Sequence, residues 1–486
     1  MSYLTLLLFI PAAGSVLLML IPRQFPVLVR FSAIFISAMT LAYSWSLLNH
    51  FDASAAGMQL VESHPWSHRL GTTFLFGIDG FSYPLVLLAS LLCLVALMAS
   101  ANLEKQTKGY YSLMLLLEAA MLGVFTAQDW ALFYVFWELT LIPLFFLIDR
   151  WGGKRRHGAA LNFVLYTMGG SVFMLISLLV TFDNVPGHSF AMAAMADTAR
   201  HLPVEAQVMI FLGLLVGFGV KMPIFPIHGW LPLAHVEAPS PVSILLSGIL
   251  LKMGSYGLIR ATAMLPGAAI ALQSVLVALA LFSLLYGGLL AWRQTDLKAM
   301  IAYSSISHMA VVLLGISTLN HSGLTGAVSQ MIAHGLVAGA LFLLIGQLYE
   351  RTHTRDIRDY SSLVRVTPRF AFFTTLTLVA AIGMPGTAGF IAELHALIGG
   401  YERWGWLVLL LSIGMLISAA YAIRTAARLF TGPVRPGLAN TPDLQLGESV
   451  AAGVLATGTL VLGIFPVLML GLVSASVHNL VRSFTG

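Results

Sequence analysis

Long apolar runs alternate with short polar connectors along almost the whole chain. A transmembrane helix needs about 20 consecutive apolar residues, and about fourteen runs approach that length. They cover residues 3–22, 28–48, 80–100, 110–127, 130–149, 160–181, 206–236, 240–263, 268–291, 300–318, 324–347, 370–400, 404–427 and 448–480. The last run contains Pro466, where we expect a kink, and residues 183–205 indicate a loop with a short surface helix. The pattern predicts an all-α polytopic membrane protein with about 14 transmembrane helices.

Two of the runs are interrupted by proline near their middle. Run 206–236 breaks at Met222-Pro223 and run 370–400 at Met384-Pro385. Proline removes a backbone donor and kinks a helix, and interrupted spans at matching positions of two halves point to a transport site. The two breaks lie five helices apart, and an odd number of helices inverts the second copy. We therefore predict two inverted five-helix repeats, each containing a broken helix; two unrelated proline kinks are the alternative.

The predicted organisation has four parts. Helices 1–3 occupy residues 1–109, the first repeat (helices 4–8) occupies 110–263, the inverted repeat (helices 9–13) occupies 264–430, and the C-terminal helix 14 lies in 431–486. The first run, Met1 to Pro22, has neither a basic leading segment nor a small-residue cleavage site. It is therefore expected to be the first span rather than a signal peptide.

Composition agrees with a membrane protein and leaves too little polar chain for a separate soluble domain. Charged residues make up 9% of the sequence, whereas soluble domains contain about 25%. The net charge of +5 would permit nucleic-acid binding, but the basic residues lie in short loops between apolar runs. That distribution indicates membrane topology, and no nucleic-acid partner is expected.

The basic residues are divided unevenly between the two sets of alternating loops. One set holds Arg23, Arg30, Lys105, Lys108, Arg150, Lys154, Arg155, Arg156, Arg293, Lys298, Arg351, Arg355, Arg358, Arg365, Arg369, Arg424, Arg428 and Arg435, and the other holds Arg69, Arg200, Arg260, Arg403 and Arg482. Loops rich in Lys and Arg face the cytoplasm. Both termini are therefore expected on the outer, periplasmic side.

No redox or metal centre is expected in this chain. The single cysteine, Cys93, lies inside an apolar run and cannot form an internal disulfide. No Cys/His spacing suggests zinc, haem or an iron–sulfur cluster, and there is no Rossmann glycine pattern or P-loop.

Four charged residues stand inside the apolar runs. Glu138 lies in the middle of the fifth span, Lys221 at the break of the seventh, Lys252 in the middle of the eighth, and Glu393 just after the break of the twelfth. A charge at the bilayer centre costs about 2.5–3.5 kcal/mol on insertion scales, so such residues face the bundle interior and have partners. Burial disfavours the charged form and an opposite charge favours it, which lets a Glu–Lys pair exchange a proton near neutral pH. The alternative is a set of static salt bridges that fix helix packing.

Histidines and a further glutamate extend the set. His308 and His334 lie at mid-span depth, between the Lys and Glu positions in chain order. An imidazole has a pKa near 6.5 and carries protons readily, although a buried histidine also serves in packing. Glu118 on the fourth span either couples to a neighbouring subunit or forms a hydrogen bond within the bundle. His228, His235 and Glu237 follow the first break and are expected to line a polar cytoplasmic vestibule rather than to bind a metal.

Together these residues resemble the antiporter-like proton-channel family of respiratory complex I and its relatives. The matching stretches are FYVFWELTLIPLFFLI, GFGVKMPIFPIHGWLPLAHVEAPSPVSILLSGILLKMGSYGLIR, QTDLKAMIAYSSISHM, SQMIAHGL and MPGTAGFIAE, which run through residues 79–430. The resemblance implies that Glu138 pairs with Lys221, that Lys252 connects the two halves and that Glu393 is the exit group. The L- and N-type members carry Lys at the exit position and the M-type carries Glu, as here; the chain also lacks the long lateral helix of the L-type. The stretch after Glu393, LHALIGGY, is less similar to the family.

The resemblance implies a proton-translocating subunit of NADH:quinone oxidoreductase in a bacterial inner membrane. Its neighbours would be L- and N-type subunits, and FMN, iron–sulfur clusters and quinone would be bound by partner subunits. Three other functions remain open at this point. They are a subunit of a multi-component Na⁺/H⁺ antiporter, a relative in a membrane-bound hydrogenase or carbon-uptake complex, and a structural anchor without transport.

Overall fold

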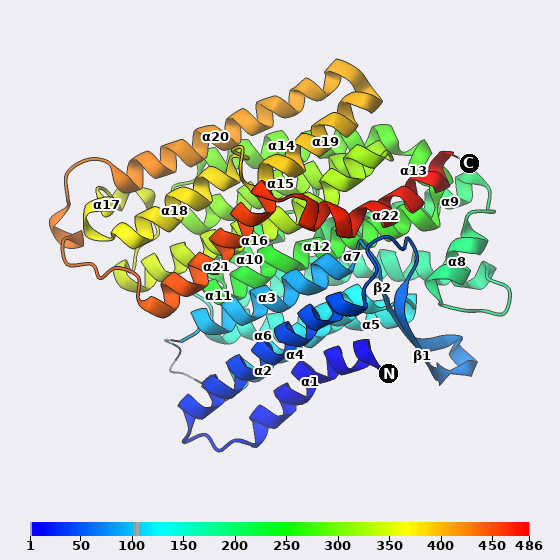
Figure 1. The fold of residues 1–486 in the computed structure, drawn as a ribbon, viewed down its shortest axis with the longest axis horizontal. Helices are drawn as coiled ribbons and strands as arrows, with labels where there is room; N and C mark the ends of the chain where they lie inside the picture. The colour runs from blue at the N-terminus through cyan, green and yellow to red at the C-terminus, as the bar shows by residue number, and fades with distance from the viewer. Residues whose placement is uncertain (1, 102, 104–105, 486) are drawn as a thin grey trace.

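The computed structural model describes residues 2–101, 103 and 106–485. Lys105, which the topology prediction places in a basic loop, lies outside these residues. Most of the chain forms long helices that lie side by side (Figure 1). The N-terminus, the C-terminus and the strands β1 (Gln59–Ser67) and β2 (Thr72–Ile78) gather at the same end of these helices. The face at the other end carries the loops of Lys154, Arg155 and Arg355 and is called the basic face below.

The helices that cross the bundle follow the apolar runs closely. They are α1 (Tyr3–Leu20), α2 (Pro26–Ser46), α3 (Tyr83–Ala99), α4 (Thr107–Thr126), α5 (Trp130–Leu139) with α6 (Leu141–Trp151), α7 (Arg156–Asn184), α9 (Val204–Lys221), α11 (Ser240–Leu245) with the π-helical turn η3 (Leu246–Leu250) and α12 (Leu251–Met264), α14 (Gln273–Arg293), α15 (Leu297–Thr318), α16 (His321–Thr352), α18 (Pro368–Ala381) with α19 (Ala388–Trp404), α20 (Leu409–Phe430) and α21 (Leu446–Ile464).

Short elements connect these helices. They are α8 (Met192–Ala199), α10 (Trp230–Glu237), α13 (Pro266–Ala271) and α17 (Leu363–Val366), with the 3₁₀ turns Leu47–His50, His68–Leu70, Ile357–Asp359, Gly405–Val408 and Pro436–Leu438. A further long helix, α22 (Val467–Thr485), follows α21. The surface helix predicted within 183–205 is α8. In the described part of the chain, thirteen helices are long and apolar enough to cross a membrane, and α3 and α18 are shorter apolar helices. The chain is therefore a multi-pass membrane protein.

The last apolar run forms two helices rather than one. The kink predicted at Pro466 is a complete break between α21 and α22, because proline cannot donate the backbone hydrogen bond that would continue the helix. Helix α22 then packs against α16 and α3. Ser476 Oγ accepts a hydrogen bond from Gly80 N at 2.9 Å, just before α3, and His478 contacts His321 at the start of α16.

The burial of the helices differs between the centre and the edge of the bundle. The spans Ser240–Met264 and His321–Thr352 are buried along their full apolar length, and Leu297–Thr318 is nearly so. By contrast, α1, α2, α20 and α21 bury only about a third, and their exposed apolar faces suit contact with lipid. The central helices carry Lys252, His308 and His334. These polar groups therefore lie where protein surrounds them on all sides.

The β1–β2 hairpin is a feature that the apolar pattern did not predict. Its two strands pair antiparallel, and Glu62 on β1 reaches the start of α1. The Glu62 carboxylate accepts hydrogen bonds from Leu4 N at 2.6 Å, Thr5 N at 3.0 Å and Thr5 Oγ1 at 2.6 Å. The first N–H groups of a helix have no partner within the helix. Glu62 therefore acts as a cap supplied from a distant part of the chain.

We expect Glu62→Ala to destabilise the N-terminal helix without affecting the buried polar residues. Losing a capping group costs about 0.5–2 kcal/mol, so the variant should dissociate from its native assembly at a lower temperature. Heat treatment followed by a native gel measures this. Asp197→Asn, at an exposed position on α8, is the matched control. Equal melting of the Glu62 variant and wild type would mean that the cap contributes nothing.

Candidate functional site

The first broken span ends at the residue that the sequence singled out. Helix α9 ends at Lys221, directly before Met222-Pro223, and resumes as α10 only at Trp230. A cation at the C-terminal end of a helix is favoured by the helix dipole. Lys221 is buried, and its Nζ donates to Trp137 O at 3.2 Å and Thr140 Oγ1 at 3.1 Å. The same nitrogen lies 3.8 Å from the centre of the Trp137 ring, a cation–π contact.

Glu138 lies on the helix that faces Lys221. Asp129 caps this helix, accepting from Ala131 N at 2.9 Å and Leu132 N at 3.1 Å. Burial raises the pKa of the Asp129 carboxyl, although these hydrogen bonds act against the rise. Glu138 is half-buried, and its Oε1 has no hydrogen-bond partner among the described residues.

The pairing of Glu138 with Lys221 is not a contact ion pair in this conformation. Within the described residues, the Glu138 charge acts on Lys221 at longer range. The ammonium instead uses oxygen atoms at the junction of α5 and α6, because Thr140 and the Trp137 carbonyl lie closer to it. The two residues are therefore coupled through space.

Lys252 lies directly after the π-helical turn of the eighth span. Such a turn replaces i→i−4 bonds by wider ones and frequently marks a functional site. Here the Ser247 carbonyl, five residues before Lys252, accepts from Lys252 Nζ at 2.7 Å. The same Nζ lies 2.6 Å from His334 Nδ1, and Lys252 is completely buried. An ammonium that donates to an imidazole nitrogen is arranged to hand over a proton.

The row continues from His334 to the second broken span. The ring centres of His334 and His308 lie 5.6 Å apart. His308 Nδ1 lies 3.7 Å from Glu393 Oε1, and His308 Nε2 lies 3.3 Å from the Tyr421 hydroxyl. Four of the six residues proposed from sequence therefore form one continuous row, Lys252–His334–His308–Glu393. It spans helices α12, α16, α15 and α19.

The second break is shaped around Glu393. Helix α18 ends at Ala381 and α19 starts at Ala388, on either side of Met384-Pro385. Gly383 in this break has φ +76°, and a Cβ there would overlap the Glu393 carboxylate. Glycine alone fits both conditions. Glu393 is buried, and its Oε2 has no partner among the described residues. The free oxygen is available to bind a proton.

Two polar residues that the sequence analysis placed elsewhere lie close to this site. Lys298 was predicted to lie in a basic loop, but the structure places it in the first turn of α15, buried, with Nζ donating to Ala238 O at 2.8 Å. His235 is sealed in the core and stacks on Phe342 with ring centres 4.6 Å apart. The charges of Lys298 and Lys252 both act on His235. His235 therefore lies between the basic face and the row.

A cavity of about 1170 Å³ opens beside Lys298. It contains Glu237, whose carboxylate accepts from Arg155 N at 2.9 Å, but neither His228 nor His235. Its charged lining comprises Lys154, Arg155, Arg156, Glu237, Asp296, Lys298, Glu350, Arg355 and Asp356. Of the three residues predicted to line a cytoplasmic vestibule, Glu237 lines this cavity, whereas His228 and His235 do not.

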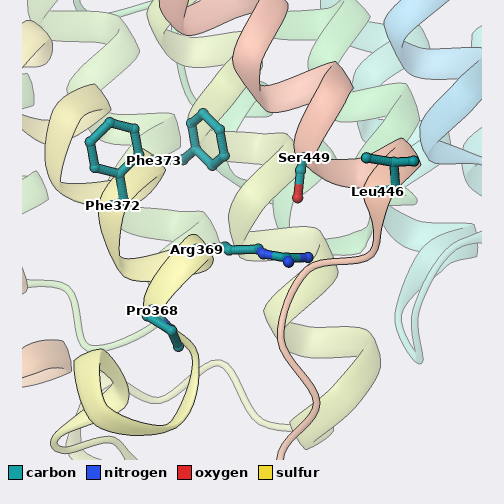
Figure 2. Close-up of a pocket in the computed structure, with 6 residues that line it drawn as sticks. All are labelled: Pro368, Arg369, Phe372, Phe373, Leu446 and Ser449. Carbon is teal, nitrogen blue, oxygen red and sulfur yellow. The ribbon is translucent and has the colours of Figure 1, made fainter.

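Another hollow, of about 510 Å³, lies between the beginnings of α18 and α21 (Figure 2). Its lining is apolar apart from Arg369 and Ser449, and no residue of the row reaches it. It plays no part in the site.

The remaining candidates have local partners. Glu118 is completely buried and accepts a hydrogen bond from Ser37 Oγ at 3.1 Å. This is the hydrogen bond within the bundle that was one of the two alternatives for Glu118. Coupling to a neighbouring subunit stays a prediction. His228 packs between Phe225 and Tyr286. Among the described residues, no group of three or more His, Cys, Asp or Glu could hold a metal ion.

Comparison with known proteins identifies the family. Residues 127–418 match the family described as NADH:quinone oxidoreductase/Mrp antiporter, TM, and residues 16–127 match the amino terminus of NADH-ubiquinone oxidoreductase chain 4. The chain belongs to the NADH:quinone oxidoreductase/Mrp antiporter family. Within it, the chain is 40% identical to an NAD(P)H-quinone oxidoreductase chain 4 of Thermosynechococcus vestitus, over 88% of this chain and 82% of that protein. It is 36% identical to the NADH-quinone oxidoreductase subunit M of Rhodobacter capsulatus, over 99% and 97%.

Solved structures of antiporter-like subunits have the same fold. A chain of respiratory complex I from Thermus thermophilus superposes with a TM-score of 0.91 at 30% identity, covering 99% of this chain and all of that one. A chain of the Mrp complex from Dietzia superposes with a TM-score of 0.87 at 20% identity, covering 100% and 99%. The second likeness concerns the fold alone. The subunit M and chain 4 relatives place this chain in the M-type group of antiporter-like subunits.

Proposed function

We propose that this chain is the M-type proton-translocating membrane subunit of an NADH:quinone oxidoreductase. Its relatives bear the names of that enzyme's subunit M and chain 4. We further propose that it lies in a bacterial inner membrane with the basic face in the cytoplasm and both termini in the periplasm. L- and N-type subunits would be its neighbours, and FMN, iron–sulfur clusters and quinone would be held by partner subunits.

The row Lys252–His334–His308–Glu393 is the observation that carries the proposal. A static salt bridge needs only two opposite charges, whereas here two neutral-to-cationic imidazoles link an ammonium to a carboxylate. Each member accepts a proton from one neighbour and donates it to the next. The row joins the last helix of the first predicted repeat to the break of the second, which supports the division at residues 110–263 and 264–430.

Charge coupling in the first half would drive the row. With Glu138 ionised, its negative charge attracts the Lys221 ammonium at the end of α9. When that attraction weakens, Lys221 releases its proton and the charge felt by Lys252 changes. Lys252 then protonates His334, and the proton proceeds through His308 to Glu393. Reprotonation of Lys252 comes from the basic face, through the cavity, Lys298 and His235.

Purification of the native complex that contains this chain tests the proposed function. Mass spectrometry should find flavin-binding and iron–sulfur subunits together with L- and N-type subunits, and NADH oxidation in proteoliposomes should acidify the lumen. A complex composed only of small membrane subunits that exchanges Na⁺ for H⁺ would instead identify an antiporter. NADH oxidation by the complex without any proton movement would identify the chain as a structural anchor.

We expect Glu138→Gln to preserve assembly and to reduce both proton pumping and coupled quinone reduction sharply. Glutamine keeps the shape of the side chain but removes the charge that acts on Lys221. Lumenal acidification and NADH oxidation in proteoliposomes measure the effect. Glu205→Gln, at an exposed position in the first turn of α9, is the matched control. Full coupling in the Glu138 variant would support static packing.

A further inference from the structure

Three histidines from three separate helices gather at the end of α16, on the same face as the termini. His321 is the first residue of α16, His395 lies on α19 and His478 lies on α22. The rings of His321 and His478 have centres 4.2 Å apart. The charged forms of His478, His395 and Glu402 all act on His321. Helices α16 and α19 approach closely here, because Gly326 packs against the backbone at His395.

We propose that His321, His395 and His478 form a proton-accepting cluster that takes the proton released by Glu393 and passes it to the medium. This inference rests on the proposed function and assigns the final part of the route. His395 lies two residues after Glu393, about 3 Å further along the helix axis. Exposure rises along the cluster: Glu393 is buried, His321 and His395 are half-buried, and His478 is exposed.

The hydrogen bonds leave acceptor nitrogens available. His395 Nδ1 lies 2.8 Å from the carbonyl oxygen of Ile391. A carbonyl only accepts, so Nδ1 carries the hydrogen and Nε2 of the neutral ring keeps its lone pair. His321 Nε2 is buried without a hydrogen-bond partner among the described residues. These two nitrogens can therefore accept a proton without breaking an existing bond.

Three other charged residues lie near the cluster. Glu402 accepts a hydrogen bond from Ser322 Oγ at 3.3 Å. Arg403 donates to Gln273 Oε1 at 2.6 Å and is engaged there. Arg482 lies one turn after His478 on α22.

In the proton step, the Glu393 carboxyl loses H⁺ through water to an imidazole nitrogen, which then loses it to bulk water. No bond other than O–H and N–H changes.

The test uses the purified complex in proteoliposomes, where NADH outside drives protons into the lumen. A His321→Gln/His395→Gln/His478→Gln variant is compared with wild type at low and high concentrations of a trapped, impermeant buffer that titrates near neutral pH. At low lumenal buffer, pumping by the triple variant should fall several-fold, and high lumenal buffer should restore it. Wild type should be nearly insensitive to the buffer. Imidazole groups titrate near neutral pH, so a mobile buffer can replace them.

His201→Gln is the matched control, because His201 is exposed in the connector after α8 and apart from the cluster. A triple variant that pumps as well as wild type at both buffer concentrations would overturn the inference. So would a loss of pumping that buffer does not restore, since damage to packing is insensitive to buffer. Failure of the proposed function is distinguishable, because wild type itself would then move no protons.

Discussion

Replacing Lys252 by alanine is expected to stop proton pumping while the complex still assembles. Lys252 Nζ is the donor 2.6 Å from His334 Nδ1, and the described residues provide no second ammonium in contact with that ring. A positioned acid–base group contributes roughly 10²–10⁴-fold to a proton transfer. We therefore expect pumping to fall by about 10²-fold, the lower end of that range. Because the side chain lies in a fully buried span, water cannot easily take its place.

A second substitution separates charge from proton release at the same position. Lys252→Arg keeps a cation, but the guanidinium has a pKa above about 12 and releases a proton poorly. It should assemble well and keep only part of the pumping. Lys108→Met, a half-buried lysine at the start of α4, is the control for loss of a positive charge. Full pumping by both the Ala and the Arg variants would remove Lys252 from the route.

Sequence reasoning predicted the membrane architecture because that information is local. Each span needs its own apolar run, and each break needs its own proline, so both are visible in a short window. The same logic explains the failure at the hairpin. Strand β1 reads QLVESHPWS, with Pro65 inside it and no regular alternation of apolar residues. A strand that depends on pairing with β2 and on capping α1 leaves little local signal.

The contacts between residues of the site depend on tertiary packing. The sequence shows only how far each candidate residue lies inside its apolar run. His308, His334 and Glu393 were selected because charged and titratable residues are rare inside apolar runs. Their spacing could not reveal that Lys252 and His334, 82 positions apart, come to 2.6 Å. The π-helical turn beside Lys252 contains no proline, so the sequence gives no signal for it. Its carbonyl partner, Ser247 O, is visible only in three dimensions.

Residues at the edges of apolar runs were the ones that sequence reasoning misjudged. Lys298 lies two residues before the apolar run 300–318 and was taken for a loop residue, although burial in the first turn of α15 gives it a different role. His321 and His478 also lie near run edges. Sequence position cannot show that α22 packs against α16 and brings His478 to His321. A search for charged residues within a few positions of each apolar run would have found Lys298.

The second large effect is expected at Glu393, the end of the row. It is the only carboxylate that contacts His308 in the described part of the chain, with His308 Nδ1 3.7 Å from its Oε1. In the proposed route, its proton leaves when positive charge arrives behind it through His334 and His308. We expect Glu393→Ala to lower coupled turnover strongly with assembly intact, because His308 then has no acceptor. Proton uptake in proteoliposomes, with a native gel for assembly, measures both properties.

Two further substitutions at this position distinguish proton transfer from packing. Glu393→Gln keeps the shape of the side chain and its contact with Gly383, but an amide neither holds nor releases a proton at neutral pH, so it should behave like alanine. Glu393→Lys replaces the carboxylate by another titratable group and should retain partial pumping. Glu402→Gln, at an exposed position on the same helix, has a smaller expected effect, through His321 alone. If glutamine at 393 pumps as well as wild type while lysine fails, Glu393 is a packing residue and the proton leaves elsewhere.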